Sequence, residues 1–283
     1  MKRMVPASIL FAGMLCICIM ASLLLSTRKK PKTEYDFSDF TKNEKRNQEL
    51  IEGSFLLKVN MPMNETIPVM YAVPFSEETG KLRRNASKIV FYAPYCGDEK
   101  RLKDGFIPWH REFAEIYGYS IFTFAVNTSR EMIENDNIYY IYKENGWPEI
   151  VFQIQGEIQK RFALKKEKLY IVGESSGGSF AQQIVAAYPE KVCMAAWNGG
   201  TRYARFQKET KTRILATNIW GDTGCLYTAL LKEQADAMGI DMEFHVTPPN
   251  DRASSKMYKL HAGWQLNYDM ITAFITGNDY KRC

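Results

Sequence analysis

The sequence predicts an α/β domain in which a mostly parallel central sheet carries helices on both faces. Apolar runs of strand length alternate with helical runs of ten or more residues from about residue 50 to residue 280, the pattern of βαβ units. A chain of 283 residues with 46% hydrophobic content can bury the one sizeable core that such a domain needs. One apolar strand also runs directly into a glycine-flanked serine and then into a helix.

The N-terminal segment 1–27 is almost entirely apolar. Met4 to Leu25 carries no charge and is long enough to cross a bilayer as a helix, which takes about 20 such residues. Because this run exceeds the ~7–15 apolar residues of a cleavable signal peptide, we expect an uncleaved signal anchor or transmembrane helix. Secretion after signal cleavage is the alternative. The basic cluster after the segment favours a cytoplasmic domain by the positive-inside rule, whereas the short N-terminal tail favours export. We expect a membrane-anchored protein with an extracytoplasmic domain.

The next segment, 28–50, is charged and poor in aliphatic residues, so we expect a tether without packed elements. Residues 51–283 are then expected to form one domain. The formal net charge of the chain is +5, and no basic stripe with interleaved aromatic residues is present. This composition argues against a nucleic-acid partner.

The domain is expected to open with an antiparallel pair of strands and to continue with alternating strands and helices. Gly118 and Gly239 stand where helices should end, and Pro148 stands where one should begin. Only about fifteen residues separate the strand ending near Asn198 from the strand starting at Ile214, too few for a large cap domain. The expected strands are 54–59, 67–74, 88–93, 120–126, 169–172, 192–197, 214–220 and 242–246, and the expected helices are 109–117, 148–158, 176–188, 226–238 and 264–275.

The segment Gly173-Glu174-Ser175-Ser176-Gly177 fits the pattern G-x-S-x-G. Small residues on both sides of the serine let the backbone turn sharply and expose the Ser175 hydroxyl. On these residues the chain resembles the α/β-hydrolase superfamily, and Gly-Glu-Ser-Ser-Gly-Gly is similar to the elbow of its carboxylesterases. The resemblance covers roughly residues 50–280. It implies the α/β-hydrolase fold and a serine nucleophile, followed along the chain by an acid and then by a histidine.

A serine hydroxyl becomes a good nucleophile only when a base removes its proton, and the chain has three histidines. His110 falls on a predicted helix and His245 falls within the last predicted strand, so we interpret both as structural or surface groups. His261 follows the final strand by a polar loop and directly precedes the last helix, where the superfamily carries its general base. We therefore assign the base to His261.

The acid should follow a strand between the serine and the histidine. Asp222 does so in Gly221-Asp222-Thr223-Gly224, from where it could hold the far nitrogen of His261. The competing interpretation of Asp222 is a helix N-cap. Asp241 and Asp251 are the reserve candidates, although Asp251 lies in a Pro-Pro-Asn-Asp turn where a carboxylate is expected anyway.

The charge that develops on a substrate carbonyl needs two backbone donors, each worth about 3 kcal/mol. One should be the amide of Ser176, at the start of a helix whose dipole favours an anion. The other should be the amide of Tyr95 or Cys96. The family often shows His-Gly-Gly at this place, whereas this chain shows Pro94-Tyr95-Cys96-Gly97, so the second donor remains open between these two residues.

No cofactor or metal site is expected. The chain has no C-x-x-C pair, no H-E-x-x-H and no G-x-G-x-x-G, and no Lys-Ser/Thr follows the glycine-rich elbow. Cys96, Cys193, Cys225 and Cys283 allow three disulfide pairings, which the sequence does not rank.

These observations predict a membrane-anchored serine hydrolase that cleaves a small-molecule or polymer-linked carboxylic ester by a Ser-His-Asp acyl-enzyme mechanism. A serine peptidase or an acyltransferase would use the same residues. A catalytically silent, hydrolase-like binding protein is a further alternative, suggested by the unusual loop after Pro94.

Overall fold

The computed structural model describes residues 35–40, 43–61, 64–94, 108–126, 129–200, 202–249 and 264–277, with the side chains of 108–110 and 264–266 left out of the description. The expected signal anchor at 1–27 lies outside these residues. The chain divides into a unit 1–34 and a compact unit 35–283. Among the described residues, no helix is long and apolar enough to span a bilayer.

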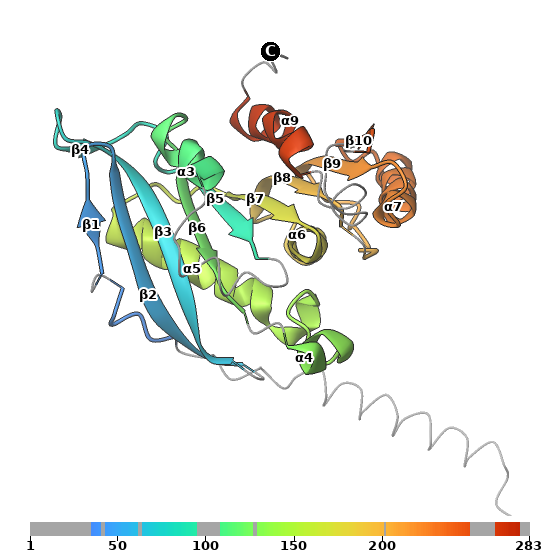
Figure 1. The fold of residues 1–283 in the computed structure, drawn as a ribbon, viewed down its shortest axis with the longest axis horizontal. Coiled ribbons are helices and arrows are strands. Elements are labelled where there is room, and N and C mark those ends of the chain that lie inside the picture. The colour runs from blue at the N-terminus through green and yellow to red at the C-terminus, as the bar shows by residue number, and fades with distance from the viewer. Residues whose placement is uncertain are drawn as a thin grey trace, which may run out of the picture. The chain divides into compact units, whose positions relative to one another are not determined.

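In the described part of the chain, ten strands form one sheet (Figure 1). Nine of them lie in the order β1-β2-β3-β6-β5-β7-β8-β9-β10, and β4 pairs with β3. The pairs from β6 to β10 are parallel, whereas the pairs that involve β2 or β3 are antiparallel. The expected mostly parallel sheet with an antiparallel opening is confirmed. The strands are β1 Lys45–Arg46, β2 Leu50–Met61, β3 Asn64–Ser76, β4 Lys81–Leu82, β5 Ile89–Ala93, β6 Ser120–Phe124, β7 Leu169–Glu174, β8 Val192–Asn198, β9 Arg213–Ile219 and β10 Met242–Thr247.

Helices cover both faces of this sheet, as the sequence predicts (Figure 1). Buried residues of α5, α6 and α7 belong to the core on one face, and those of α3 and α9 belong to the core on the other. The described helices are α3 Pro108–Glu115, α4 Arg130–Glu134, the 3-10 helix η1 Lys143–Asn145, α5 Trp147–Arg161, α6 Ser176–Ala187, α7 Gly224–Met238 and α9 Trp264–Thr276.

The central strands are buried on both faces, which is why they appear in the sequence as unbroken apolar runs. Along β5, Ile89, Phe91 and Ala93 enter one core, while Val90 and Tyr92 enter the other. This alternation is the two-residue period of a strand.

The segment expected to be a tether is packed from residue 35 onward, so this part of the expectation is wrong. Phe40 is buried, and its ring stacks on Tyr71 with the centroids 4.7 Å apart. The Tyr71 hydroxyl donates to Glu44, and β1 pairs with β2. Burying a phenylalanine side chain stabilises the folded state by about 1.5–3 kcal/mol. This contribution explains why the segment packs although it contains few aliphatic residues. The compact unit therefore begins at residue 35 rather than at residue 51.

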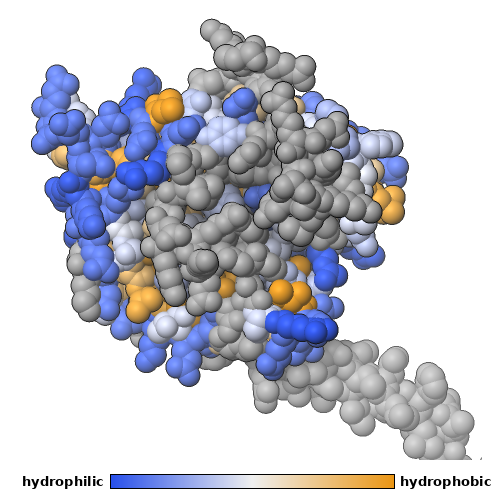
Figure 2. Space-filling view, viewed as in Figure 1, coloured by the Kyte–Doolittle hydropathy of each residue, from blue (hydrophilic) through white to orange (hydrophobic). Residues whose placement is uncertain are grey.

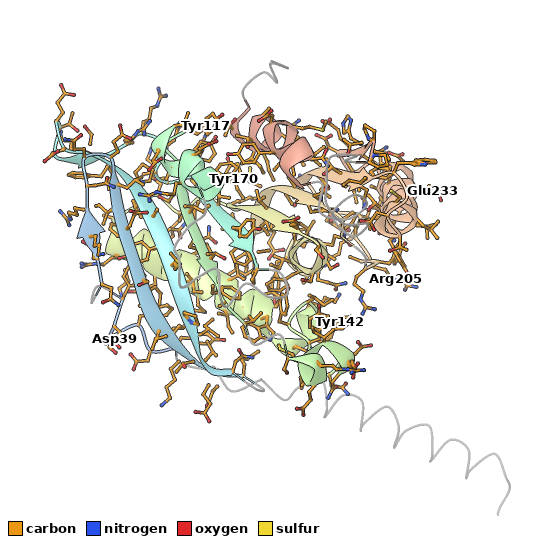
Figure 3. The ribbon with its side chains drawn as sticks, viewed as in Figure 1. Asp39, Tyr117, Tyr142, Tyr170, Arg205 and Glu233 are labelled. Atoms are coloured by element: carbon orange, nitrogen blue, oxygen red, sulfur yellow. The ribbon has the colours of Figure 1, made fainter. Side chains whose placement is uncertain are left out.

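The connection between β8 and β9 contains no helix within its described residues, 199–200 and 202–212. It is bound to the helices on either side: Gln207 Nε2 donates to the Ala186 carbonyl at 2.9 Å, and the Phe206 amide donates to Gln234 Oε1 at 2.8 Å. Arg205 of this connection lies near α7 (Figure 3). A connection this short, attached to α6 and α7, has no room for a large cap domain.

On the face shown in Figure 2, the described residues present mainly hydrophilic side chains, and hydrophobic ones appear in small separate areas. Some of the exposed apolar side chains lie on α7, at Leu226, Tyr227 and Leu230. The larger apolar side chains are otherwise mostly in the two cores.

Candidate active site

Three parallel strands, β7, β8 and β9, carry polar residues to the same edge of the sheet. Ser175 follows β7, Asn198 ends β8, and Asp222 follows β9. In register, Glu174 of β7 pairs with Asn198, and Asn198 pairs with Thr217 of β9. The carboxyl ends of strands in open α/β sheets are where ligands bind. We therefore take this edge as the candidate active site.

Ser175 occupies a strained turn between β7 and α6. Its φ of 52° and ψ of −121° lie in a region that L-residues with a side chain rarely adopt. The Ser175 amide donates to the Asn198 carbonyl at 2.8 Å, and the Ser175 carbonyl accepts from the Ser179 amide at 3.0 Å. These backbone bonds hold the strained conformation, and a sharp turn from a strand into a helix is what the sequence pattern predicts at this serine.

The glycines of the pattern are required because backbone segments approach each other closely here. A Cβ atom at Gly173 would overlap the Gly177 carbonyl, and a Cβ atom at Gly177 would overlap the carbonyls of Ala93 and Pro94. At Gly178 a Cβ atom would lie 3.3 Å from the Gly200 Cα. The pattern thus lets α6 start against β5 and against the loop after β8.

Replacing Gly177 by alanine is expected to destabilise the protein by about 1–3 kcal/mol and to lower activity, because the overlap must displace backbone. Gly156 on α5 is the matched control. A Cβ atom at Gly156 meets nothing within 4 Å, so Gly156→Ala should stabilise the helix by about 0.5–1 kcal/mol. Chemical denaturation of both variants tests this, and equal stabilities would contradict it.

The Ser176 amide lies at the first position of α6, where the helix dipole favours an anion. Ser176 is 9% exposed. The two candidates for the second donor, Tyr95 and Cys96, lie outside the described residues. The chain enters their loop at Pro94, whose carbonyl accepts from the Tyr140 hydroxyl at 2.7 Å. Tyr140 thus holds Pro94, the last described residue before these two candidates.

Asp222 lies on the loop between β9 and α7 and is 8% exposed. Its Oδ1 accepts from the amide of Gly224, the first residue of α7, at 2.8 Å, although the N-cap position itself is occupied by Thr223. This bond orients the carboxylate without removing it from the edge that carries Ser175. A Cβ atom at Gly224 would lie 3.0 Å from the Gly200 carbonyl, so the loops after β8 and β9 lie side by side.

Asp241, a reserve acid, lies at the opposite edge of the sheet. It precedes β10 and pairs at 3.0 Å with Arg213, the first residue of β9. Because β9 and β10 are parallel, both residues lie at the amino ends of their strands, away from Ser175. This placement excludes Asp241. The other reserve, Asp251, lies outside the described residues.

His261, the expected base, also lies outside the described residues, as does the side chain of His110. His245 is on β10, its side chain is 45% exposed, and its Nε2 lies 3.4 Å from Glu243. It is therefore a surface group, as expected. The helix that follows His261 in the chain, α9, packs against β7, β8 and β9.

Sequence reasoning missed Asn198 and Asn267 as residues of this edge. Asn198 Oδ1 accepts from Asn267 Nδ2 of α9 at 2.8 Å and from Thr217 Oγ1 at 3.0 Å. The sequence does offer a signal for Asn198, because this residue is a polar amide at the end of the apolar strand Ala195-Ala196-Trp197-Asn198. A buried amide must find hydrogen-bond partners, so such a residue indicates a polar network at the end of the strand.

Cys193 and Cys225 are free thiols, and Cys96 and Cys283 lie outside the described residues. Burial raises the pKa of the Cys225 thiol, and the Asp222 carboxylate raises this pKa further. The thiol also approaches the Ile219 carbonyl at 3.1 Å. Cys225 therefore stays protonated at neutral pH, which makes it a poor nucleophile.

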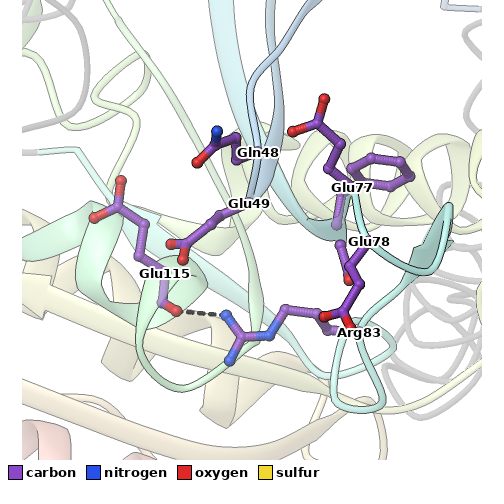
Figure 4. Close-up of a pocket in the computed structure, with 8 residues that line it drawn as sticks. Gln48, Glu49, Glu77, Glu78, Arg83 and Glu115 are labelled. Carbon is purple, nitrogen blue, oxygen red and sulfur yellow. Dashed lines mark hydrogen bonds between the residues drawn. The ribbon is translucent and has the colours of Figure 1, made fainter.

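A surface pocket of about 730 Å³ lies elsewhere, lined by Gln48, Glu49, Phe75, Ser76, Glu77, Glu78, Arg83 and Glu115 (Figure 4). Its walls come from the turn before β2, the end of β3, the turn between β3 and β4, Arg83 just after β4, and the end of α3. Arg83 donates to the backbone carbonyls of Ala114, Glu115 and Ile116, so its charge caps the end of α3. This pocket is separate from the serine edge. No group of acidic, cysteine or histidine side chains suited to a metal ion occurs among the residues that the structure describes.

No protein-family model matches the chain, and no curated protein matches it either. Solved structures do. A thermostable esterase aligns with a TM-score of 0.60 at 15% identity over 80% of this chain, and a ferulic acid esterase aligns with a TM-score of 0.57 at 12% identity over 83%. A putative dipeptidyl aminopeptidase IV from Bacteroides ovatus aligns with a TM-score of 0.55 at 14% identity over 82%.

The chain spans 62% of the thermostable esterase, 100% of the ferulic acid esterase and 36% of the peptidase. At such low identity these likenesses bear on the fold alone. The strand order, the strained serine turn and the structural likenesses together show that the chain has the α/β-hydrolase fold.

Proposed function

We propose that this protein is a serine hydrolase that cleaves carboxylic esters. The observation that carries the proposal is the strained turn that holds Ser175 at the start of α6, next to the buried Ser176 amide. Asp222, on the loop after β9 at the same edge of the sheet, would provide the acid that such a site needs. The solved esterases with this fold support an ester as the substrate.

In the proposed mechanism, the Ser175 hydroxyl attacks the ester carbonyl while His261 takes its proton. Asp222 holds the other ring nitrogen of His261 and stabilises the imidazolium. The Ser176 amide and the amide of Tyr95 or Cys96 donate to the oxyanion. His261 then gives the proton to the departing alcohol, and an acyl group stays on Ser175. Water, activated by His261, attacks this acyl group and releases the acid.

The substrate is expected to carry a short acyl group, because the short connection after β8 offers no helix to cover a long chain. The test is hydrolysis of p-nitrophenyl acetate, butyrate and decanoate by the full chain in detergent, with fluorophosphonate labelling alongside. Hydrolysis should be fastest on the two short esters. A folded protein that neither hydrolyses nor labels would favour the silent binding protein instead.

Peptide cleavage is the second candidate, favoured by the likeness to the putative dipeptidyl aminopeptidase. Both reactions pass through the same acyl intermediate, so the leaving group distinguishes them. A larger kcat/KM on dipeptide nitroanilides than on matched nitrophenyl esters would establish the peptidase. Acyl transfer would appear as product formation with an added alcohol acceptor in place of water.

We also propose that residues 4–25 anchor the protein in a membrane and leave the hydrolase domain on the extracytoplasmic side. The support is the uncharged length of this segment. Alkaline carbonate extraction should leave the protein in the membrane pellet, and protease added to intact cells should digest the domain. Release into the medium with a cleaved N-terminus would establish secretion instead.

A further inference from the structure

We propose that Asn198 and Asn267 are positioning residues that set the distance between the serine turn and the helix following the general base. This inference rests on the proposed function. Asn198 ends β8, and Asn267 lies in the first turns of α9, six residues after His261 in the chain. Neither residue is expected to touch the substrate.

Asn198 forms hydrogen bonds both to the serine turn and to helix α9. Its backbone carbonyl accepts from the Ser175 amide at 2.8 Å and so supports the strained turn. Its side-chain Oδ1 accepts from Asn267 Nδ2, also at 2.8 Å. The nucleophile's backbone and helix α9 are therefore joined through one residue.

Further bonds extend the link to the strands on either side of β9. Asn198 Oδ1 also accepts from Thr217 Oγ1 of β9 at 3.0 Å. Asn267 Nδ2 lies 3.4 Å from Thr247 Oγ1 at the end of β10, and this hydroxyl donates to the Asn218 carbonyl at 3.3 Å. The network thus ties α9 to the ends of β8, β9 and β10. The Asn198 carbonyl at the end of β8 bonds the serine turn, β9 leads to Asp222, and β10 precedes the segment that contains His261.

Burial indicates that this link serves geometry rather than stability. Asn198 is 1% exposed and Asn267 is 0% exposed. Asn198 Nδ2 and Asn267 Oδ1 are buried without a hydrogen-bond partner among the described residues, and burying an unsatisfied polar atom is costly. Apolar side chains of similar size would avoid this cost, but they could not fix the direction and length of the contact as a hydrogen bond does.

The experiment compares Asn267→Ala, Asn198→Ala and the double variant in the full chain, with Ser120→Ala as the matched control. Ser120 is buried and donates one hydrogen bond, to the Ala86 carbonyl, at the amino end of β6. Each single asparagine variant should lower kcat on p-nitrophenyl butyrate by about 10- to 100-fold, because a displacement of the order of 1 Å has effects of this size. KM should change by no more than about twofold, because neither asparagine is expected to touch the substrate and its binding should therefore stay the same.

Two further readouts separate positioning from a general loss of packing. The acidic limb of the pH profile of kcat/KM should shift in the asparagine variants and stay in place in Ser120→Ala, because this limb reports the general base. The double variant should lose no more activity than the worse single variant, since both changes break the same link. Melting temperatures are recorded for the wild type and all four variants.

Wild-type kcat and an unshifted pH profile in either folded asparagine variant would overturn the inference and leave the proposed function standing. So would additive losses in the double variant. A wild-type protein with neither hydrolysis nor fluorophosphonate labelling would overturn the proposed function, and this inference with it. If Asn267→Ala does not fold, Asn198→Ala tests the same bond from its other side.

Discussion

Ser175→Ala is expected to abolish ester hydrolysis and fluorophosphonate labelling while leaving the fold intact. Without the hydroxyl no acyl-enzyme can form, and losses of roughly 10⁴- to 10⁶-fold in kcat follow when the nucleophile of such a site is removed. The backbone bond from residue 175 to the Asn198 carbonyl does not involve the side chain, so the turn should persist. The measurements are initial rates, probe labelling in gels and circular dichroism.

Ser120→Ala is the control for this variant as well, because it removes a buried hydroxyl at the opposite edge of the sheet. It should lose some stability and keep its rate and labelling. Undiminished labelling of Ser175→Ala would remove Ser175 from the role of nucleophile.

Asp222→Asn is expected to lower kcat by roughly 10²- to 10⁴-fold with a small effect on stability. An asparagine cannot stabilise the imidazolium of His261, and its amide can hold the wrong tautomer. Its Oδ1 can still accept from the Gly224 amide, so this bond to the start of α7 is retained. The variant therefore separates the catalytic role of Asp222 from its structural role, and the measurements are kcat, KM and a thermal melt.

Asp241→Asn is the matched control, because its side chain is 61% exposed and lies at the amino edge of β9 and β10. Breaking its exposed ion pair with Arg213 should change stability by no more than about 1 kcal/mol and leave kcat unchanged. Wild-type kcat in Asp222→Asn, or a large loss in Asp241→Asn, would show that another residue supplies the acid.

Long strands and helices could be predicted from the sequence because each carries a strong local signal. The run Ile89 to Ala93 is unbroken and apolar, since a strand buried on both faces must be apolar at every position. Short polar elements had no such signal. The strand Lys45–Arg46 exists only because β2 offers it backbone partners, and helix Arg130–Glu134 has a single buried residue, Met132.

The candidate site, like the fold, has one part that the sequence predicts and another that only the tertiary structure shows. The chain around Ser175 by itself determined the strained turn, because strand, small residues and helix follow one another within a dozen positions. The sequence already favoured Asp222 over Asp241, because Asp222 follows a predicted strand and Asp241 precedes one, and the tertiary structure then placed Asp241 at the amino ends of β9 and β10. Tertiary structure alone decided that Asn198 meets Asn267 and that Phe40 packs on Tyr71. Contacts between residues far apart in the chain depend on how the strands assemble, and no local pattern records that assembly.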